Sequence, residues 1–361
     1  AIKPFLQGMT LDMQPLFLAI FFGISLWLSI SPQKLVNRIG NVLTPALLLV
    51  ILLFVAIRSG SINLTFAQIF RGLFIEYNED FATIYDLRFP RILVAILAGA
   101  GISVSAVMFQ AVMKNPLVDP GMIGISSGAS FISMILMLVL PQFYFLSPLF
   151  AFVGGALTCA LIYTLSWKGG IKPLRVILIG VAVNAMFTGL LGAINAMSGP
   201  AQNSVTAIVN ANISQKTWGD VSLLSKYISI GMLLAIIFSG RCNLLALEDK
   251  TIRSIGVNVD LLRIYISAIA TLLIGMSTAI VGSIAFIGLI VPHVARIFVG
   301  NDNRVLIPYS MLLGAFTMLL ADTVGKILIA PLEIPVGVVM SVVGGPFFIF
   351  LLKKSEGLHE S

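Results

Sequence analysis

The stretch from Arg88 to Ala129, RFPRILVAILAGAGISVSAVMFQAVMKNPLVDPGMIGISSGA, is the most informative part of this chain for the fold. Two arginines three residues apart are followed by a long run rich in Gly, Ala and Ser. Small residues let helices in a membrane approach each other closely, so the pattern is typical of a helix packed inside a membrane bundle. The breaks at Asn115-Pro116 and Asp119-Pro120 are expected where the chain leaves the bilayer or is covered by protein.

The composition indicates an all-α, polytopic membrane protein. Of the 361 residues, 58% are hydrophobic and only 10% are charged, and the mean hydropathy is +1.04. Soluble domains are about a quarter charged. The net charge of +7 is better explained by basic loops on the cytoplasmic side than by nucleic-acid binding, because no basic cluster is interleaved with exposed aromatic residues.

Ten apolar runs are long enough, with their flanks, to be bilayer helices. They are residues 43–57, 91–109, 121–140, 146–167, 174–197, 227–240, 263–282, 284–299, 305–325 and 335–352. A further apolar run, Leu16–Ile30, is marginal in length and could form an eleventh helix or an interfacial segment. We therefore expect an N-terminal leader at 1–42, a transmembrane domain at 43–352 and a cytoplasmic tail at 353–361.

Basic residues predict the orientation of these helices. If the first of the ten starts inside, the inner side holds most of the Lys and Arg. The basic residues of the outer loops are accompanied by acids, which include Glu76, Glu79, Asp80, Asp86 and Asp220. This bias favours a cytoplasmic C-terminus. It places Arg88, Arg91 and Lys326 at outer helix ends and makes residues 241–262 the main inner loop.

No catalytic or metal-binding pattern is found in the sequence. The chain has no GxxxxGK[ST] or HExxH motif. Cys159 and Cys242 lie far apart in or beside apolar runs, with no Cys/His cluster, so packing is the expected role of both. If transport uses ATP, another chain must hydrolyse it.

Several motifs closely resemble those of the FecCD-type permeases, the membrane subunits of ATP-driven importers for ferric siderophores, haem and cobalamin. The motifs are RFPR at 88–91, QAVMKNPLVDP at 110–120, GISSGA at 124–129, GLIVPHVAR at 288–296, LLAD at 319–322, EIPVGV at 333–338 and GGPFF at 344–348. The resemblance covers residues 45–352 and implies a type II importer bundle in the bacterial cytoplasmic membrane.

The resemblance also implies a set of partners. These are a second permease subunit, identical or homologous, two ATP-binding-cassette ATPase subunits that bind ATP-Mg, and an extracytoplasmic substrate-binding protein. No cofactor is expected on this chain itself. The implied cargo is an iron chelate, ferric siderophore or haem, with cobalamin less favoured.

Three outer basic residues match positions that receive acids of the binding protein in the family. They are Arg88, Arg91 and Lys326, the last being a lysine where the family often has arginine. The alternative is that they are anchors whose charged heads reach the membrane interface.

The inner loop LLALEDKTIRSIGVNVDLLR, residues 244–263, has the pattern of one or two short amphipathic helices. The resemblance implies that it fits a groove on the ATPase, as helix-in-groove recognition. The alternative is an ordinary solvated loop. The candidate coupling residues are Leu245, Leu247, Glu248, Asp249, Arg253, Ile255 and Gly256.

Polar residues inside apolar helices are candidates for the translocation path, because embedded polar groups often face a bundle interior. They are Gln110, Asn184 and Asn195, and hydrogen bonding between helices is an equally open interpretation. Structural roles are expected for Asn115, Pro116, Gly124, Gly128, Pro292 and His293. Gly337, Ser341 and Gly345 predict one small face of the last helix, for packing within the chain or against a second permease subunit.

The chain is therefore interpreted as a FecCD-like permease subunit working by alternating access. The rival hypothesis is a secondary carrier driven by an ion gradient, suggested only by residues 12–57. Such a carrier would usually need an embedded acid or a broken helix at the midplane.

Overall fold

The computed structural model describes residues 33–58, 79–167, 171–198, 213–329 and 332–356. The chain divides into two parts, residues 1–44 and 45–361. Of the first part only the start of one helix is described. The predicted leader 1–42, with Leu16–Ile30, therefore lies mostly outside the described residues, and the tail 353–361 is described only to residue 356.

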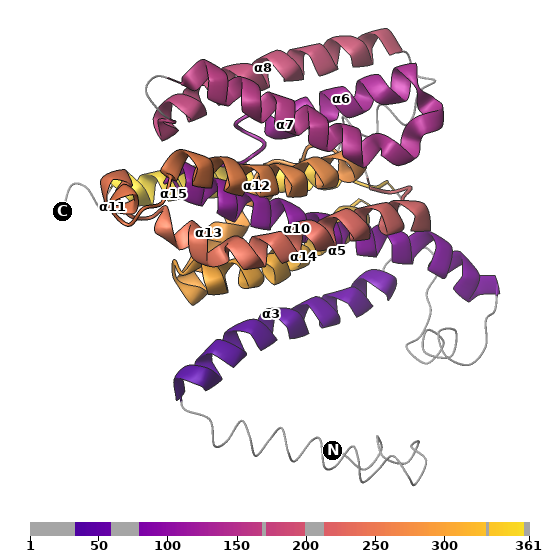
Figure 1. Ribbon diagram of the computed structural model, residues 1–361. Helices are drawn as coiled ribbons and strands as arrows, with labels where there is room; N and C mark the ends of the chain where they lie inside the picture. The colour runs from indigo at the N-terminus through magenta and orange to yellow at the C-terminus, as the bar shows by residue number, and fades with distance from the viewer. Residues whose placement is uncertain (1–32, 59–78, 168–170, 199–212, 330–331, 357–361) are drawn as a thin grey trace. The chain divides into compact units, whose positions relative to one another are not determined.

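Helices make up almost all of the described structure (Figure 1). They are α3 (Gln33–Arg58), α5 (Glu79–Met113), α6 (Ile125–Val139), the 3-10 turn η1 (Pro141–Leu146), α7 (Ser147–Ser166), α8 (Pro173–Ser198), α10 (Trp218–Leu244), α11 (Asp249–Ser254), α12 (Val259–Val281), α13 (Ile287–Val299), α14 (Asn303–Ile327) and α15 (Val336–Glu356). Each of the ten predicted runs from residue 43 onward overlaps one of them, so the predicted all-α membrane fold is confirmed. Within the described ranges, α5, α7, α8, α10, α12 and α14 are long and apolar enough to cross a membrane, and α3, α6, α13 and α15 carry shorter apolar segments.

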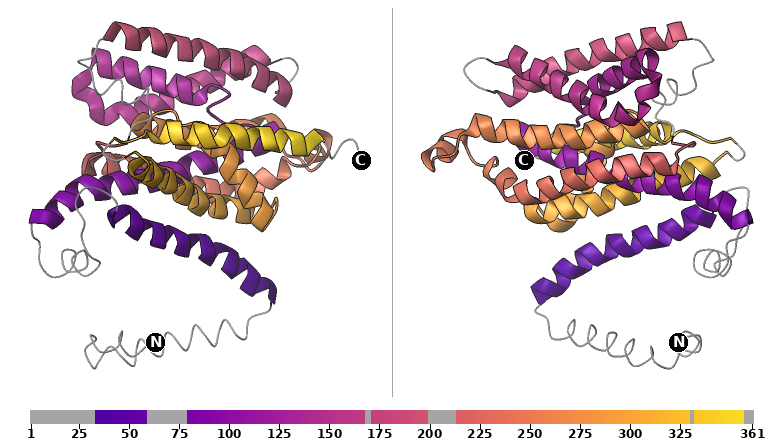
Figure 2. Two further views of the ribbon diagram at one scale, coloured as in Figure 1. Left: turned by 180° about the vertical axis from the view of Figure 1, so that it is seen from behind. Right: turned by 45° about the vertical axis from the view of Figure 1, so that its right-hand side comes forward.

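Helix α5 lies at the centre of one group of helices. It packs against α10, α12, α13 and α14 (Figures 1 and 2). Its Ser103 and Ser105 are completely buried and donate hydrogen bonds to neighbouring helices: Oγ of Ser103 to Ser310 O at 2.8 Å, and Oγ of Ser105 to Ala270 O at 2.7 Å. The Gly-Ala-Ser run therefore serves close packing and polar contacts between helices, as predicted.

The closest helix contact lies between α5 and α14. A Cβ at Gly99 would collide with the backbone of Gly314, and a Cβ at Gly314 would collide with Ser103 and with the Gly99 carbonyl. The two backbones can touch only because both residues lack side chains. This contact sets the spacing of the two helices.

Helices α6, α7 and α8 form a second group, which packs on α12 through α6 and α7 (Figure 2). Residues 121–124, predicted as the start of a span, form turns instead, so α6 begins only at Ile125. Gly124 has a φ of 87°, a left-handed conformation that glycine adopts readily. A Cβ there would also lie 2.9 Å from the backbone N of Asn184 on α8.

The chain also breaks between α12 and α13, so residues 284–286, predicted as the start of a span, are not helical and α13 begins only at Ile287. Gly282 ends α12 with a φ of 78°, and Phe286 precedes α13 with a φ of 70°. A left-handed Phe is rare and costs about 1–3 kcal/mol. The Phe286 ring lies against α15, where a Cβ at Gly344 would collide with it.

The face of small residues predicted on α15 does not make this close contact with the Phe286 ring. A Cβ at Gly345 would meet no atom within 4 Å, and Ser341 is exposed. Gly344, one residue away, makes the contact inside the chain. The face predicted from Gly337, Ser341 and Gly345 is therefore largely uncovered within this chain.

The contact of α5 with α14 predicts the effect of Gly314→Val. The new side chain would overlap Ser103 and the Gly99 carbonyl, and we expect the free energy of unfolding to fall by about 1–3 kcal/mol, the usual cost of overpacking. Thermal unfolding in detergent micelles measures this. Gly189→Val is the matched control, because a Cβ at Gly189 meets no atom within 4 Å. Equal midpoints for the two variants would contradict the assigned contact.

Candidate functional site

Four charged side chains meet at the predicted outer end of α5 and α14. Nε and Nη2 of Arg91 donate to Oδ1 of Asp322 at 2.9 and 2.8 Å, and its Nη1 donates to Oε2 of Glu333 at 2.8 Å. Nζ of Lys326 lies 3.1 Å from Oδ2 of Asp322. This group, called the outer cluster below, contains two cations and two anions.

The outer cluster is largely buried. The side chains of Arg91, Lys326 and Asp322 are 7%, 8% and 0% exposed, while Glu333 is 43% exposed. Partial burial alone would raise the pKa of Glu333, but the hydrogen bond and charge of Arg91 hold that pKa below its ordinary value. Glu333 is thus a solvent-accessible carboxylate that is bound to the buried guanidinium of Arg91.

The three predicted docking cations therefore differ in accessibility. Arg91 and Lys326 have acidic partners within the chain. Arg88 is half-buried, and its Nη1 donates to the Ile57 carbonyl at 2.7 Å, which ties α5 to α3. Docking at these residues stays a prediction, but an acid arriving at Arg91 would have to compete with acids already bound there.

A second polar network lies at the predicted inner end and holds the short helix α11. Nζ of Lys114 at the end of α5 donates to Oδ1 of Asp249 at 3.0 Å and to the Leu247 carbonyl. Nη2 of Arg263 on α12 donates to the same Asp249 oxygen at 3.0 Å, and its Nη1 donates to Ile171 O at 3.0 Å. We call Lys114, Asp249 and Arg263 the inner network.

Asp249 is the shared carboxylate of the inner network. Its partial burial would raise its pKa, but the hydrogen bond from Lys114 and the charge of Arg263 lower that pKa below its ordinary value. Arg263 is only 2% exposed. Because one carboxylate bridges two cations, α11 is joined both to α5 and to α12.

The predicted coupling residues divide between the core and the surface. Leu245 is completely buried. Leu247 and Ile255 are 44% and 57% exposed, and Glu248, Arg253 and Gly256 are exposed beside them. The segment is therefore amphipathic, as predicted. Leu245 packs into the bundle, and the exposed surface on the other side is partly apolar.

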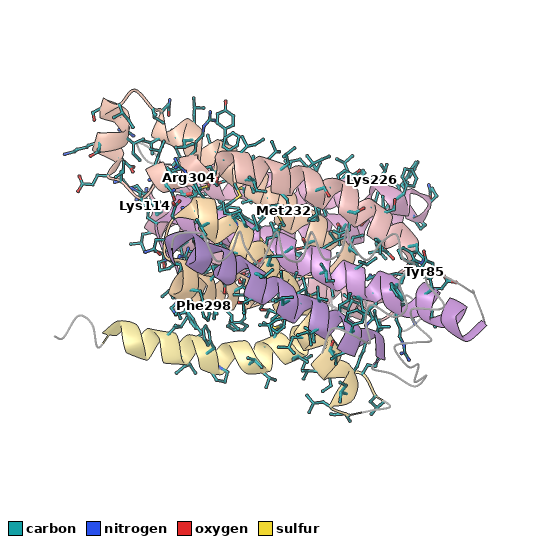
Figure 3. All side chains as sticks on the ribbon, turned by 90° about the horizontal axis from the view of Figure 1, so that it is seen from below. Tyr85, Lys114, Lys226, Met232, Phe298 and Arg304 are labelled. Carbon is teal, nitrogen blue, oxygen red and sulfur yellow. The ribbon has the colours of Figure 1, made fainter. Side chains whose placement is uncertain are left out.

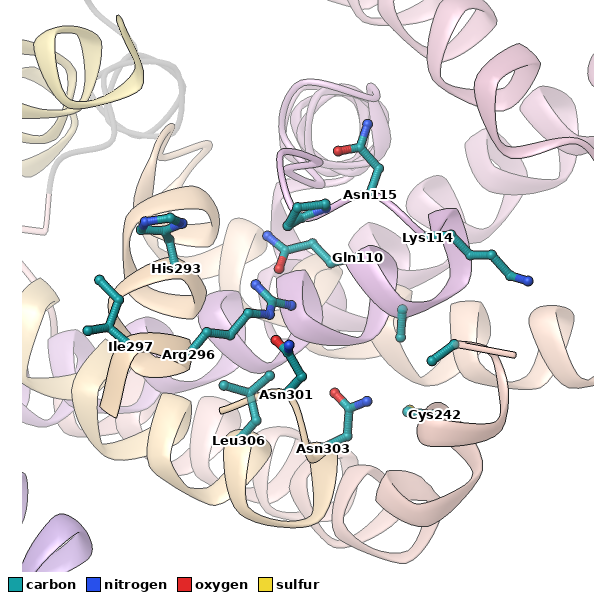
Figure 4. Close-up of a pocket in the computed structure, with 13 residues that line it drawn as sticks. Gln110, Lys114, Asn115, Cys242, His293, Arg296, Ile297, Asn301, Asn303 and Leu306 are labelled. Carbon is teal, nitrogen blue, oxygen red and sulfur yellow. The ribbon is translucent and has the colours of Figure 1, made fainter. Parts of the chain in front are cut away.

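The predicted path residues line two different cavities. Gln110 lines a cavity of about 650 Å³ at the inner end, called the inner cavity, together with Asn115, Pro116 and His293 (Figure 4). Asn184 lines a cavity of about 380 Å³, called the side cavity. The polar residues lining the side cavity are Ser127, Ser130, Asn184, Thr188 and Ser283. The side chain of Asn195 on α8 lies outside what the structure describes.

The predicted structural residues occupy turns and close contacts. Oδ1 of Asn115 accepts a hydrogen bond from the Leu117 amide at 2.9 Å, and a Cβ at Gly128 would collide with Thr158. Pro292 is buried inside α13. The His293 ring lies edge-on to Phe347 of α15, with centroids 5.9 Å apart.

Asp119 is a buried acid that sequence reasoning did not single out. It is 2% exposed, and its Oδ1 accepts a hydrogen bond from the Gly121 amide at 2.6 Å. A Cβ at Gly288 would lie 2.8 Å from its Oδ2, so the carboxylate faces the first turn of α13, where the helix dipole favours an anion. The only available signal was an acid beside Pro120 in an otherwise apolar segment.

The bundle and its charged ends define a multi-pass membrane permease. The sequence model of the FecCD transport family matches residues 48–354. The chain is 39% identical over 312 residues to the Staphylococcus aureus (strain Newman) protein named "Probable heme-iron transport system permease protein IsdF", covering 86% of this chain and 95% of that protein. The strain MW2 protein of the same name is 38% identical.

Solved structures agree with this assignment. One described as an inward-facing conformation of a metal-chelate type ABC transporter is 28% identical with a TM-score of 0.74, over 88% of this chain and 99% of that one. PsaBC from Streptococcus pneumoniae, at 19% identity and a TM-score of 0.53, shares the fold. The chain belongs to the FecCD transport family and is a multi-pass protein of the bacterial cytoplasmic membrane.

The outer cluster predicts a large effect of Asp322→Asn. The variant keeps the shape of the side chain but leaves Arg91 and Lys326 buried with one partly exposed carboxylate, Glu333. We expect the free energy of unfolding to fall by about 3–5 kcal/mol, measured by thermal unfolding in detergent.

Asp86→Asn, an equal charge change at an exposed site on α5, should be nearly neutral. Adding Lys326→Met to Asp322→Asn should recover part of the loss, because it removes one uncompensated cation. No recovery in the double variant would contradict the ion-pair explanation.

Proposed function

We propose that this chain is the permease subunit of an ATP-binding-cassette importer that carries an iron chelate, ferric siderophore or haem, across the cytoplasmic membrane. Haem is the favoured cargo. The observation that carries this is the identity of 39% over nearly the whole length of permeases named for haem-iron transport. The chain itself would bind no cofactor and do no chemistry on the cargo.

The proposed assembly contains a second permease subunit, identical or homologous, two ATPase subunits that bind ATP-Mg, and an external binding protein. The uncovered face of α15 supports contact with a second permease, because small residues there would let another helix approach closely. The exposed Leu247 and Ile255 beside α11 support contact with an ATPase groove.

Docking of the binding protein is proposed at the outer end, around Arg88 and the outer cluster. Glu333 already occupies Nη1 of Arg91 and is 43% exposed. An acid from the binding protein would therefore replace Glu333 rather than find a free cation. Such an exchange sets register and orientation more than raw affinity.

The mechanism we propose is alternating access driven from the inner end. Lys114, which directly follows α5, and Tyr85, near the start of α5, lie at opposite ends of this helix (Figure 3). A movement of α11 would reach α5 through Lys114 and α12 through Arg263. Cargo would pass along α8, with Asn184 of the side cavity and Asn195 as path residues.

Uptake in the native host tests the function. Deleting the gene should abolish uptake of iron from haem, and restoring it should recover uptake, because the permease is the only route through this importer. Uptake should stop when vanadate blocks ATP hydrolysis and persist when the ion gradients are collapsed. Uptake that survives vanadate but is lost with the gradients would support a secondary carrier instead.

The inner network predicts that Asp249→Asn uncouples the ATPase. Arg263 would lose its carboxylate while buried, and charged hydrogen bonds of this kind contribute about 1.5–3 kcal/mol. We expect cargo-stimulated ATP hydrolysis by the assembled importer to fall about tenfold or more.

Asp86→Asn, at the opposite end of α5, is the control and should hydrolyse ATP at the normal rate. If the Asp249→Asn importer showed full cargo-stimulated ATP hydrolysis, the inner network would not be part of the coupling route. If the Asp249→Asn permease no longer bound the ATPase, Asp249 would instead belong to the surface that contacts the ATPase.

A further inference from the structure

Two arginines meet on α10 near its predicted inner end. Arg241 lies in the last turn of α10 and is exposed, and its guanidinium carbon is 4.7 Å from the centroid of the Phe238 ring, at cation–π distance. Arg304, in the first turn of α14, is also exposed and reaches across to α10. A Cβ at Gly240 would lie 3.3 Å from its Nε and 3.4 Å from its Nη2. Figure 3 shows Arg304 at the same end of the bundle as Lys114. We call Arg241 and Arg304 the arginine pair.

The arginine pair lacks a counter-charge within the described part of the chain. Neither guanidinium group makes an ion pair there. Asp302, two residues before Arg304, instead accepts from the Asn243 side chain at 2.7 Å and from the Arg304 backbone amide at 3.0 Å. Because two cations are held at successive residues of one helix, an anion beside them would be favoured.

An exposed apolar stripe of α10 ends at the arginine pair. It consists of Ile230, Leu233 and Ile237, which are 55%, 61% and 61% exposed. Spacings of three and four residues place these side chains on one face of the helix, and Gly240 and Arg241 continue that face by one turn. Because α10 is long and apolar enough to cross the bilayer, the stripe is suited to contact acyl chains. The arginine pair then lies at the level of the headgroups.

We propose that the arginine pair binds the headgroup phosphate of an anionic phospholipid, such as phosphatidylglycerol or cardiolipin, whose acyl chains lie along the α10 stripe. The two guanidinium groups would donate to the phosphodiester oxygens. A headgroup without an ammonium group is preferred, because a choline or ethanolamine nitrogen would bring a further positive charge to two cations. The predicted orientation places the site in the cytoplasmic leaflet, where anionic lipids attract basic residues.

A lipid bound in this way would join α10 to α14. Arg304 belongs to α14, yet its guanidinium group lies on the backbone of α10 at Gly240. The same two helix ends are already linked by the hydrogen bonds of Asn243 with Asp302 and Asn303. Because α10 leads into the segment 244–263, the lipid would stabilise the helix end from which the proposed coupling segment follows.

Thermal unfolding of the purified full-length permease in detergent tests the proposal without transport. Titration with short-chain phosphatidylglycerol should raise the unfolding midpoint in a saturable way, since a ligand of the folded state stabilises it. Half-saturation should require at least about tenfold more phosphatidylcholine of the same chain length. Inorganic phosphate over the same range should leave the midpoint unchanged, because it has no acyl chains to place on the stripe.

Two kinds of variant separate a built site from general positive charge. Arg241→Gln and Arg304→Gln should each raise the half-saturating concentration of phosphatidylglycerol about fivefold. Gly240→Leu keeps both charges but leaves no room for the Arg304 guanidinium on α10, so it should also weaken binding. Lys250→Gln is the matched control, because Lys250 is an exposed cation at the same predicted end, on α11. It should bind phosphatidylglycerol normally.

Four results would overturn the proposal. The first is an equal response to phosphatidylglycerol and phosphatidylcholine, and the second is the same stabilisation by inorganic phosphate, which would indicate a site for a free anion. The third is an equal loss of binding in Lys250→Gln and Arg304→Gln, which would indicate general charge attraction. The fourth is normal lipid binding by the arginine variants with loss of ATPase binding, which would assign the arginine pair to a protein contact.

Discussion

The backbone contact between α5 and α14 at Gly99 and Gly314 is the constraint on which the bundle depends. Because the two helices touch there, Ser103 can hydrogen-bond to Ser310, and the outer ends converge enough for Arg91 to reach Asp322. A side chain at either glycine would separate the helices and stretch the ion pairs. Close packing and buried charge are thus parts of one arrangement.

The outer cluster and the inner network lie at opposite ends of α5 and differ in their net charge. In the outer cluster two cations face two carboxylates, so the charges cancel. In the inner network one carboxylate serves both Lys114 and Arg263, which leaves an excess of positive charge. A helix held by both groups behaves as one rigid element between the proposed binding-protein side and the proposed ATPase side. The proposed importer mechanism needs such an element.

The positions of the helices along the chain were predictable from the sequence, whereas contacts between distant residues were not. Apolar runs and the break at Asn115-Pro116 located the helices, because burial in lipid demands length and satisfied backbone groups. The exceptions were residues 121–124 and 284–286, which have apolar neighbourhoods but lie in the breaks before α6 and α13. Pairing of Arg91 with Asp322 depends on the rotation of two helices about their axes. A single sequence does not contain that information.

Residues of the short break before α13 form part of two features described above, the side cavity and the contact with α15. Phe286 holds an unfavourable left-handed conformation, and its ring is seated against Gly344, where no larger residue fits. Sliding α15 lengthwise along α13 would press the ring into the helix backbone. Relative motion of these two helices is therefore restricted to a pivot at that ring. Ser283, three residues earlier, lines the side cavity, so such a pivot would widen or narrow the space beside α8.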